Sequence, residues 1–140
     1  MQLPTKPVLT LDVAKQIAAA AEAEAIKNSW PVAVSIVDPG GQLIYFQKLD
    51  DTQIGSVEVS IAKARCAALF KRPSKALADV VTGGNVGMMS LPGSIPVEGG
   101  VPLYVDGQIV GAIGISGVMS NQDGIVAQAG VTALAAIVSS

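Results

Sequence analysis

The sequence VAVSIVDPGGQLIYFQK, residues 32–48, decides the fold class of this chain. Its first six residues are mostly β-branched and are typical of a strand. The turn residues Asp38-Pro39-Gly40-Gly41 follow, and a second strand runs from Leu43 to Lys48. Because a turn this short joins antiparallel strands only, the stretch predicts a β-hairpin.

The first strand of this hairpin lacks charged residues on both of its faces. Strict alternation places Val32, Val34 and Ile36 on one face and smaller residues on the other. The segment from Gln108 to Ser116 repeats the pattern, with glycine and alanine on one face. Strands that are apolar on both faces are typical of a sheet covered on both sides. We therefore expect helices on both faces, with the closer approach on the small-residue face.

The remaining elements follow from capping residues, turn residues and helical spacing. In chain order we expect a helix over 11–27 capped by Thr10, a helix from Ser56 to about Lys71, a short helix from Ser74 to Val81, a loop over 82–94, a short strand near 95–97, strands over 101–105 and 108–116 joined by Asp106-Gly107, and a helix capped by Asn121 that ends near Val138. This order predicts an α+β fold, a three-layer α/β/α sandwich with a central antiparallel sheet of about five strands. Residues 1–140 form a single domain in this interpretation, with 1–9 as an N-terminal extension.

The composition bounds the kind of partner this chain can have. Half of the 140 residues are hydrophobic and only 14% are charged, against about 25% in ordinary soluble domains. So little polar surface indicates self-association. The net charge of -2 is the wrong balance for a protein that binds the phosphate backbone, so we expect no nucleic-acid partner.

The chain has no histidine and one cysteine, Cys66. These counts exclude a Ser/His/Asp or Cys/His triad, a histidine-ligated zinc and an imidazole ligand to haem. Neither a secretory signal at the N-terminus nor an apolar run long enough to span a bilayer is visible. We therefore expect a cytoplasmic protein without a membrane partner, in which Cys66 is buried or at a subunit contact.

The helix over 56–71 carries a local excess of positive charge. Projection at 100° per residue places Val57, Ile61, Ala64 and Ala68 on a buried stripe. The same projection places Lys63, Ala67 and Lys71 toward solvent, and Glu58 and Arg65 at the border of the apolar arc. At that border, Arg65 is suited to hold a ligand carboxylate in a bidentate manner, and Glu58 to hold a polar group or a cation. The alternative is that both extend into solvent or pair with another element.

Two further segments are candidate ligand contacts. The pair Gly99-Gly100 exposes backbone N–H groups between two extended segments, although a tight turn explains it equally well. Ser116 leads toward the start of the last helix, where free N–H groups favour an anion. A nucleophilic role for Ser116 would need a lysine such as Lys63 as its base.

Metal and haem ligands have simpler alternative explanations. The acids Asp50, Asp51, Glu58 and Asp123 could supply oxygen ligands to a metal, but no ligand spacing supports this, and loop acids or a helix-start charge suffice. Packing likewise explains the soft and phenolic donors that haem iron could use, which are Met88, Met89, Tyr45 and Tyr104.

A series of short motifs, in order along the chain, carries a resemblance to a known family. They are Ser35-Ile36-Val37-Asp38 with Gly41 and Leu43, Leu49-Asp50, Lys63-Ala64-Arg65 with Ala67, Arg72-Pro73-Ser74, Gly99-Gly100-Val101-Pro102, Asp106-Gly107, Gly111-Ala112-Ile113-Gly114-Ile115-Ser116-Gly117 and Gln122-Asp123. Together they resemble the GlcG/HbpS-like family, also called the haem-degrading domain family, which includes the C-terminal domain of PduO-type corrinoid adenosyltransferases. The resemblance covers about residues 8–136.

The resemblance implies a profilin-like sandwich, assembly into tetramers or octamers, and binding of haem or corrinoid-related molecules in some members. Histidine ligation of haem, associated with some branches, has no counterpart in this sequence. The shared residues that could line a site are Arg65, Gly99, Gly100, Pro102, Ser116 and Asp123.

We therefore expect a cytoplasmic, homo-oligomeric accessory protein that binds a small anionic ligand without robust catalysis. The ligand is a small carboxylate or a porphyrin with propionates, and its expected contacts are Glu58, Arg65, Gly99, Gly100, Pro102, Ser116 and Asp123. One alternative is a weak or cofactor-assisted enzyme in which Glu58 or Asp50 is the acid/base that acts on a small carboxylate at a subunit-interface pocket. Another is an oligomer that only builds a structure or docks a partner.

Overall fold

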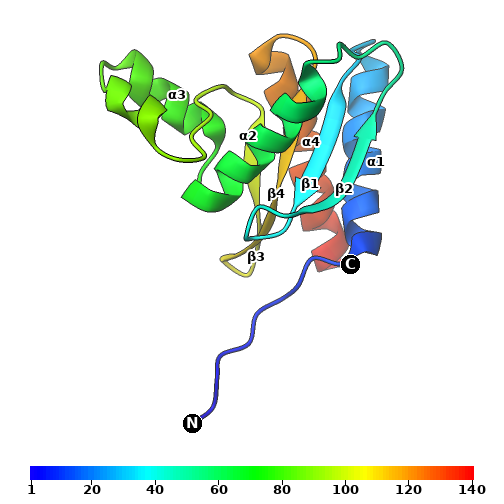
Figure 1. Ribbon diagram of the computed structural model, residues 1–140. Coiled ribbons are helices and arrows are strands. Elements are labelled where there is room, and N and C mark those ends of the chain that lie inside the picture. The colour runs from blue at the N-terminus through cyan, green and yellow to red at the C-terminus, as the bar shows by residue number, and fades with distance from the viewer.

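A computed structural model describes every residue from Met1 to Ser140 and shows an α+β sandwich around one antiparallel sheet (Figure 1). The elements in chain order are α1 (Leu11–Lys27), β1 (Ala33–Val37), β2 (Leu43–Lys48), α2 (Ser56–Phe70), α3 (Ser74–Thr82), the 3-10 helix η1 (Val86–Ser90), β3 (Gly100–Val105), β4 (Gln108–Ser116) and α4 (Ser120–Ser139). The sheet has four strands in the order β2-β1-β4-β3, and residues 1–9 form an extended segment ahead of α1.

The sheet has four strands where about five were predicted, because residues 95–97, expected to form a short strand, do not pair with it. Their backbone groups find other partners. The amide of Ile95 donates to the sulfur of Cys66 at 3.3 Å, and the carbonyl of Val97 accepts from the hydroxyl of Ser74 at 2.6 Å. Side chains of α2 and α3 thus take the hydrogen bonds that a fifth strand would have used.

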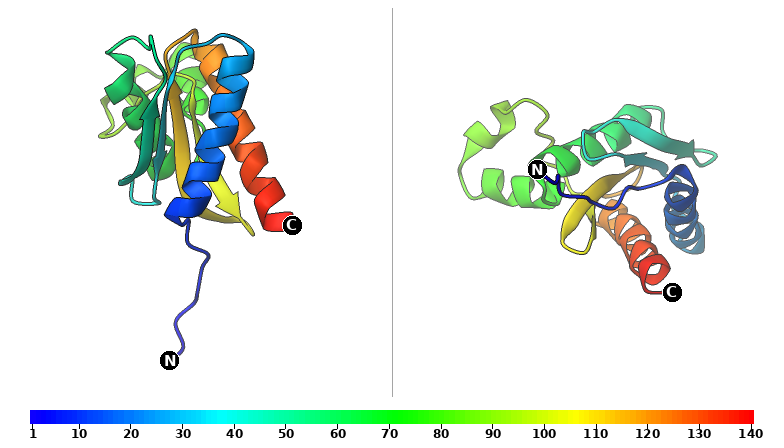
Figure 2. Two further views of the ribbon diagram at one scale, coloured as in Figure 1. Left: turned by 90° about the vertical axis from the view of Figure 1, so that its right-hand side faces the viewer. Right: turned by 90° about the horizontal axis from the view of Figure 1, so that it is seen from below.

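Helices cover both faces of the sheet, as the two apolar strand faces predict. Helices α1 and α4 pack together on one face, and α2 lies on the other (Figure 2). The large side chains Val34, Ile36 and Ile113 belong to the core on the α1/α4 face. The α2 face holds a smaller cluster that consists mainly of alanines. This asymmetry confirms the expected close approach on the small-residue side.

Glycine in β4 makes that close approach possible. A methyl group at Gly114 would collide with the carbonyl oxygen of Ser60 in α2 and would lie 2.8 Å from the β-carbon of Ala64. At the same place the hydroxyls of Ser35 and Ser60 share a hydrogen bond of 2.7 Å between β1 and α2. Helix α2 therefore rests almost directly on the backbone of the sheet.

Helix α1 has the predicted bounds, and its cap is the predicted residue: the hydroxyl of Thr10 accepts a hydrogen bond from the amide of Val13 at 3.2 Å. We expect Thr10→Ala to lower the free energy of unfolding by about 1 kcal/mol, because an amide of the first turn loses its acceptor. Urea denaturation of the two proteins measures the difference, and Thr10→Ser, which keeps an acceptor oxygen, is the matched control. Equal losses in both variants would contradict the capping role.

The other predicted helix starts differ in detail. Ser56 is the first residue of α2 and makes no capping bond there. Helix α4 begins at Ser120, ahead of the predicted cap Asn121, and the amide of Met119 instead donates to the side-chain oxygen of Gln122 at 3.2 Å. The predicted loop over 82–94 contains the short helix η1.

Helix α4 is long and apolar enough to cross a membrane by length and composition alone, although no uninterrupted apolar run suggested this. Its buried side packs against α1 and the sheet, and includes Val126, Gly130 and Leu134. A core helix of a soluble protein passes the same test of length and hydropathy.

Candidate functional site

The most unusual side chain in the fold is Lys63, which is buried with a relative exposure of 2%. The prediction that Lys63 and Ala67 face solvent was therefore wrong. Residues 99 and 100 cover this side of α2: a methyl group at Gly99 would lie 2.9 Å from the Lys63 amine, and one at Gly100 would collide with the Lys63 carbonyl. A projection of the helix alone does not include that covering segment.

The amine of Lys63 has two protein partners. Its Nζ lies 2.9 Å from Oδ2 of Asp123 and donates to the carbonyl oxygen of Ile115 at 3.0 Å. Asp123 is also buried at 2% exposure, and its Oδ1 accepts from the amide of Val118 at 3.2 Å. A buried charge without a partner is strongly destabilising, so the two ions depend on each other.

Burial raises the pKa of the Asp123 carboxyl above its ordinary value. Three interactions lower this pKa: the hydrogen bond from Lys63, the positive charge of Lys63, and the hydrogen bond from the Val118 amide. The negative charge of Glu98 raises the pKa further. The net direction is upward because loss of water around the carboxylate is the largest cause.

This shift predicts a pH dependence of stability. With the folded pKa raised, the folded chain binds the Asp123 proton more tightly than the unfolded chain does. The resulting stabilisation is fully present below the unfolded value of about 3.9 and is lost as the pH rises through the folded value. Urea denaturation over this range should show the stability of the wild type falling relative to that of Asp123→Asn as the pH rises. If the stability of the wild type instead rises relative to that of Asp123→Asn as the pH rises, the charge of Lys63 outweighs burial in setting the pKa of Asp123.

The ion pair borders a polar cavity of about 380 Å³. Residues of α2, β4 and the first turn of α4 form most of its lining, which consists of Gln53, Gly55, Ser56, Val59, Lys63, Val97, Ser116, Val118, Ser120 and Asp123. A volume of this size lies within the range of about 300–1,000 Å³ that small-molecule sites occupy. Two of the predicted site residues, Ser116 and Asp123, thus lie in one cavity.

Two hydrogen-bond donors in this cavity have no protein acceptor. The hydroxyl of Ser56 accepts from Nε2 of Gln53 at 2.9 Å and from the hydroxyl of Ser116 at 3.1 Å, so its own proton is free. Lys63 carries three N–H donors, of which Asp123 and Ile115 take two. The cavity also receives the positive end of α4 at Ser120. The arrangement favours a ligand with acceptor oxygens.

The predicted glycine pair and Pro102 lie behind this cavity and do not line it. The carbonyl of Gly99 accepts from the amide of Ile115 at 2.9 Å, and the amide of Gly100 donates to Ser74 at 2.9 Å. Pro102 is buried in β3 opposite Ala112 of β4. These residues hold the wall against which Lys63 packs.

The structure does not bring Arg65 and Glu58 to the cavity that Lys63 and Asp123 line. Both are exposed on α2 and line a separate hollow of about 340 Å³ with Ile61 and Ala62. The Arg65 side chain packs near Gly41 in the turn of the first hairpin. The expected convergence of Arg65 with Gly99-Gly100 is therefore absent from this cavity.

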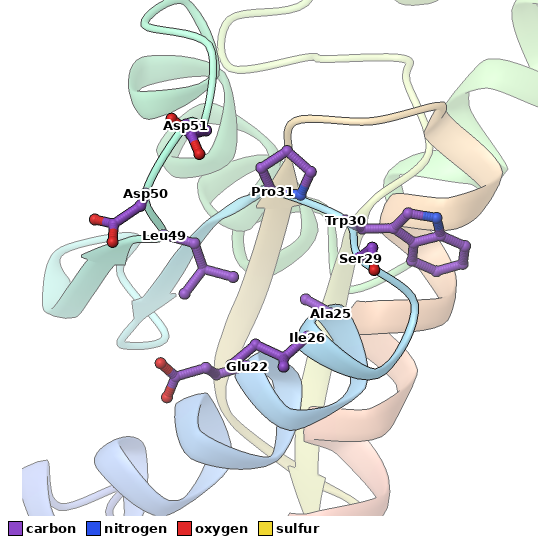
Figure 3. A pocket seen from close by; sticks show the side chains of 9 residues that line it. All are labelled: Glu22, Ala25, Ile26, Ser29, Trp30, Pro31, Leu49, Asp50 and Asp51. Carbon is purple, nitrogen blue, oxygen red and sulfur yellow. The ribbon is translucent and has the colours of Figure 1, made fainter.

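A third hollow, of about 480 Å³, is lined by Glu22, Ala25, Ile26, Ser29, Trp30, Pro31, Leu49, Asp50 and Asp51 (Figure 3). Figure 3 shows the three carboxylates separate from one another on one side of the view and the indole of Trp30 on the other side. Asp50 and Asp51, Glu58, and Asp123 thus lie in three different places. No group of three or more such side chains is placed to hold a metal ion.

The candidate haem donors are dispersed as well. The hydroxyl of Tyr104 donates to the carbonyl of Lys71 at 2.9 Å, Tyr45 packs against the core, and Met89 is 57% exposed on η1. Cys66 is buried, as predicted, and burial raises the pKa of its thiol, which makes it a weak nucleophile.

Comparisons of the sequence with family models and with individual proteins point to the same family. The family described as "Haem degrading protein HbpS-like" matches residues 9–132. The chain is 40% identical over 114 residues to Protein GlcG of Escherichia coli K12, an alignment that covers 81% of this chain and 85% of that protein.

Solved structures agree with this match. The crystal structure of the Klebsiella pneumoniae protein ORFY superposes with a TM-score of 0.88 at 29% identity and covers 97% of both chains. The structure of a PduOC:heme complex superposes with a TM-score of 0.83 at 30% identity and covers 91% of this chain and 95% of that one. The motifs, the sandwich and these matches agree, and the chain belongs to the HbpS-like family.

Proposed function

We propose that the cavity bounded by Lys63, Asp123, Ser56 and Ser116 binds a small organic acid through its carboxylate. The observation that carries this proposal is the pair of free donors, the hydroxyl proton of Ser56 and the third N–H of Lys63. A carboxylate supplies acceptors for both, and hydrogen bonds to a charged group are stronger than neutral ones. The neighbouring hydroxyls of Ser116 and Ser120 extend the polar lining.

The protein would act as a cytoplasmic, homo-oligomeric binding accessory without turnover of its own. Support for self-association comes from the protruding α3–η1 region (Figure 1), where apolar side chains are left in water. Val86 is 65% exposed, Met89 57% and Leu91 43%. Exposed apolar side chains of this density are typical of surfaces that contact another subunit.

The proposal is tested by calorimetric titration with lactate, a small 2-hydroxy acid. We expect saturable binding, and we expect Ser56→Ala to weaken it about tenfold or more because a hydrogen bond to a charged ligand is lost. Ser90→Ala is the matched control, because Ser90 lies on η1 outside the cavity and is exposed.

Arg65→Ala distinguishes the cavity from the outer hollow on α2, and it should leave lactate binding unchanged. Loss of binding in Arg65→Ala with retention in Ser56→Ala would move the ligand to Arg65 and Glu58. If neither lactate nor any other small acid binds, the proposal is refuted.

Haem is the second candidate, and its support is the PduOC neighbour solved with haem. The residues of a single chain do not fit a porphyrin, which needs an apolar cleft and an axial donor. The cavity is polar, the chain has no histidine, and the Tyr104 hydroxyl is bonded to Lys71. A haem site would have to form between subunits, where Met88 and Met89 of η1 are the candidate donors.

A titration with haemin tests this second candidate while light scattering follows the mass of the assembly. A saturable Soret shift that is lost in a Met88→Leu, Met89→Leu double variant would support haem binding between subunits. A response that does not saturate would leave the small acid as the ligand.

A further inference from the structure

One of the residues that line the cavity, Lys63, carries a primary amine, which is a nucleophile when it loses a proton. The other lysines, at positions 6, 15, 27, 48, 71 and 75, are all exposed. The Lys63 amine is instead held in place by bonds of 2.9 Å to Asp123 and 3.0 Å to Ile115. A fixed amine with a carboxylate in contact combines a nucleophile with a base that can take its proton.

We propose that Nζ of Lys63 forms a reversible imine with the carbonyl carbon of a small 2-oxo acid held in this cavity. The inference rests on the proposed function, because the acid's carboxylate must bind the free donors for its carbonyl to face the amine. It goes further by naming the ligand class and a covalent mode of binding.

The step balances without an oxidant or a reductant. Oδ2 of Asp123 takes one proton from the Lys63 ammonium, and the freed lone pair attacks the carbonyl carbon, so that a C–N bond forms while the carbonyl π electrons move to oxygen. Protons returned by Asp123 and by the amine convert that oxygen to water, which leaves as the C=N bond forms. Amine and carbonyl thus become imine and water, and hydrolysis reverses the step.

The surroundings of Lys63 suit this chemistry. Ser56 lies on the same cavity lining and can donate to an oxygen of the ligand, while Asp123 stays in contact with the nitrogen. Gly99 leaves room for the end of the Lys63 side chain, because a methyl group at Gly99 would lie 2.9 Å from the amine. The exposed lysines have no carboxylate and cavity arranged in this way, and therefore serve as internal controls for non-specific imine formation.

The experiment treats the full-length wild-type protein with pyruvate and sodium cyanoborohydride, followed by mass spectrometry of the intact chain and of its peptides. Reduction of the imine adds one pyruvic acid less one oxygen atom. We expect a single adduct, on Lys63, and protection by lactate, which has the same carboxylate but no carbonyl. We expect Asp123→Asn to slow the trapping about a hundredfold or more, because the proton acceptor is lost.

Lys63→Arg keeps a positive charge beside Asp123 and cannot form an imine, so it should give no adduct at this position. Saturable binding of lactate with no adduct on Lys63 would overturn this inference and leave the proposed function standing. Adducts spread over the exposed lysines, unaffected by lactate, would also overturn it. Absence of both lactate binding and trapping would remove both proposals.

Discussion

Lys63→Ala is expected to lower the free energy of unfolding by about 3–5 kcal/mol. The substitution removes the ammonium that lies 2.9 Å from Asp123 and leaves that carboxylate buried without a counter-ion. It also leaves the carbonyl of Ile115 without the donor at 3.0 Å. Urea denaturation of wild type and variant at neutral pH measures the loss.

The chain supplies a matched control for this substitution. Lys75 and Asp79 form an ion pair of 3.1 Å, but both side chains are more than half exposed on α3. Lys75→Ala should therefore change the stability little, because solvent screens such a pair. Replacing both Lys63 and Asp123 by Met and Leu should restore most of the loss, because no buried charge remains. Equal losses in Lys63→Ala and Lys75→Ala would show that the buried pair is not formed.

Gly114→Ala is the second substitution with a large expected effect. Its methyl group would collide with the carbonyl oxygen of Ser60 and would lie 2.5 Å from the amide nitrogen of Ala64. Because both atoms belong to the α2 backbone, no side-chain rotation relieves the clash, and the helix must move away from the sheet. Overpacking in a core costs about 1–3 kcal/mol and occasionally more, and we expect a loss at or above the upper end of that range.

Gly55→Ala is the control for Gly114→Ala, because nothing lies within 4 Å of a methyl group at Gly55. Its effect on the urea midpoint should be small. A midpoint for Gly114→Ala as high as that of Gly55→Ala would mean that α2 can shift outward at little cost.

The sequence allowed a good prediction of elements that depend on local signals. The cap at Thr10, the hairpin turns and the alternation in residues 32–37 involve neighbours a few positions apart. The closely covered sheet face was also predictable, because Gly114 leaves space that only another backbone can fill. The absence of a strand near 95–97 was not predictable from the sequence, because the backbone groups of this segment bond to Cys66 and Ser74, far away in the chain.

The candidate site was predictable only in part for the same reason. Ser116 was identified because it precedes the last helix, a local feature, and Asp123 because it belongs to the motifs shared with the family. Both lie in one cavity. Lys63 was assigned to solvent because its burial depends on Gly99 and on a partner 60 residues away. A lysine in the motif Lys63-Ala64-Arg65 gave no signal of its own.

The contact of Lys63 with Asp123 also joins the two helical layers of the sandwich. Lys63 belongs to α2 on one face of the sheet, and Asp123 belongs to α4, which packs on the other face. Their bond passes the end of the sheet at which Ala33 pairs with Ser116, opposite to the hairpin turns. The ion pair thus fastens the two helical layers to each other at this end of the sheet, whereas nearer the hairpin turns the hydrogen bond from Tyr104 to the Lys71 carbonyl links β3 to α2. A ligand bound at Lys63 would therefore contact both helical layers at once, because residues of α2 and of α4 line the same cavity.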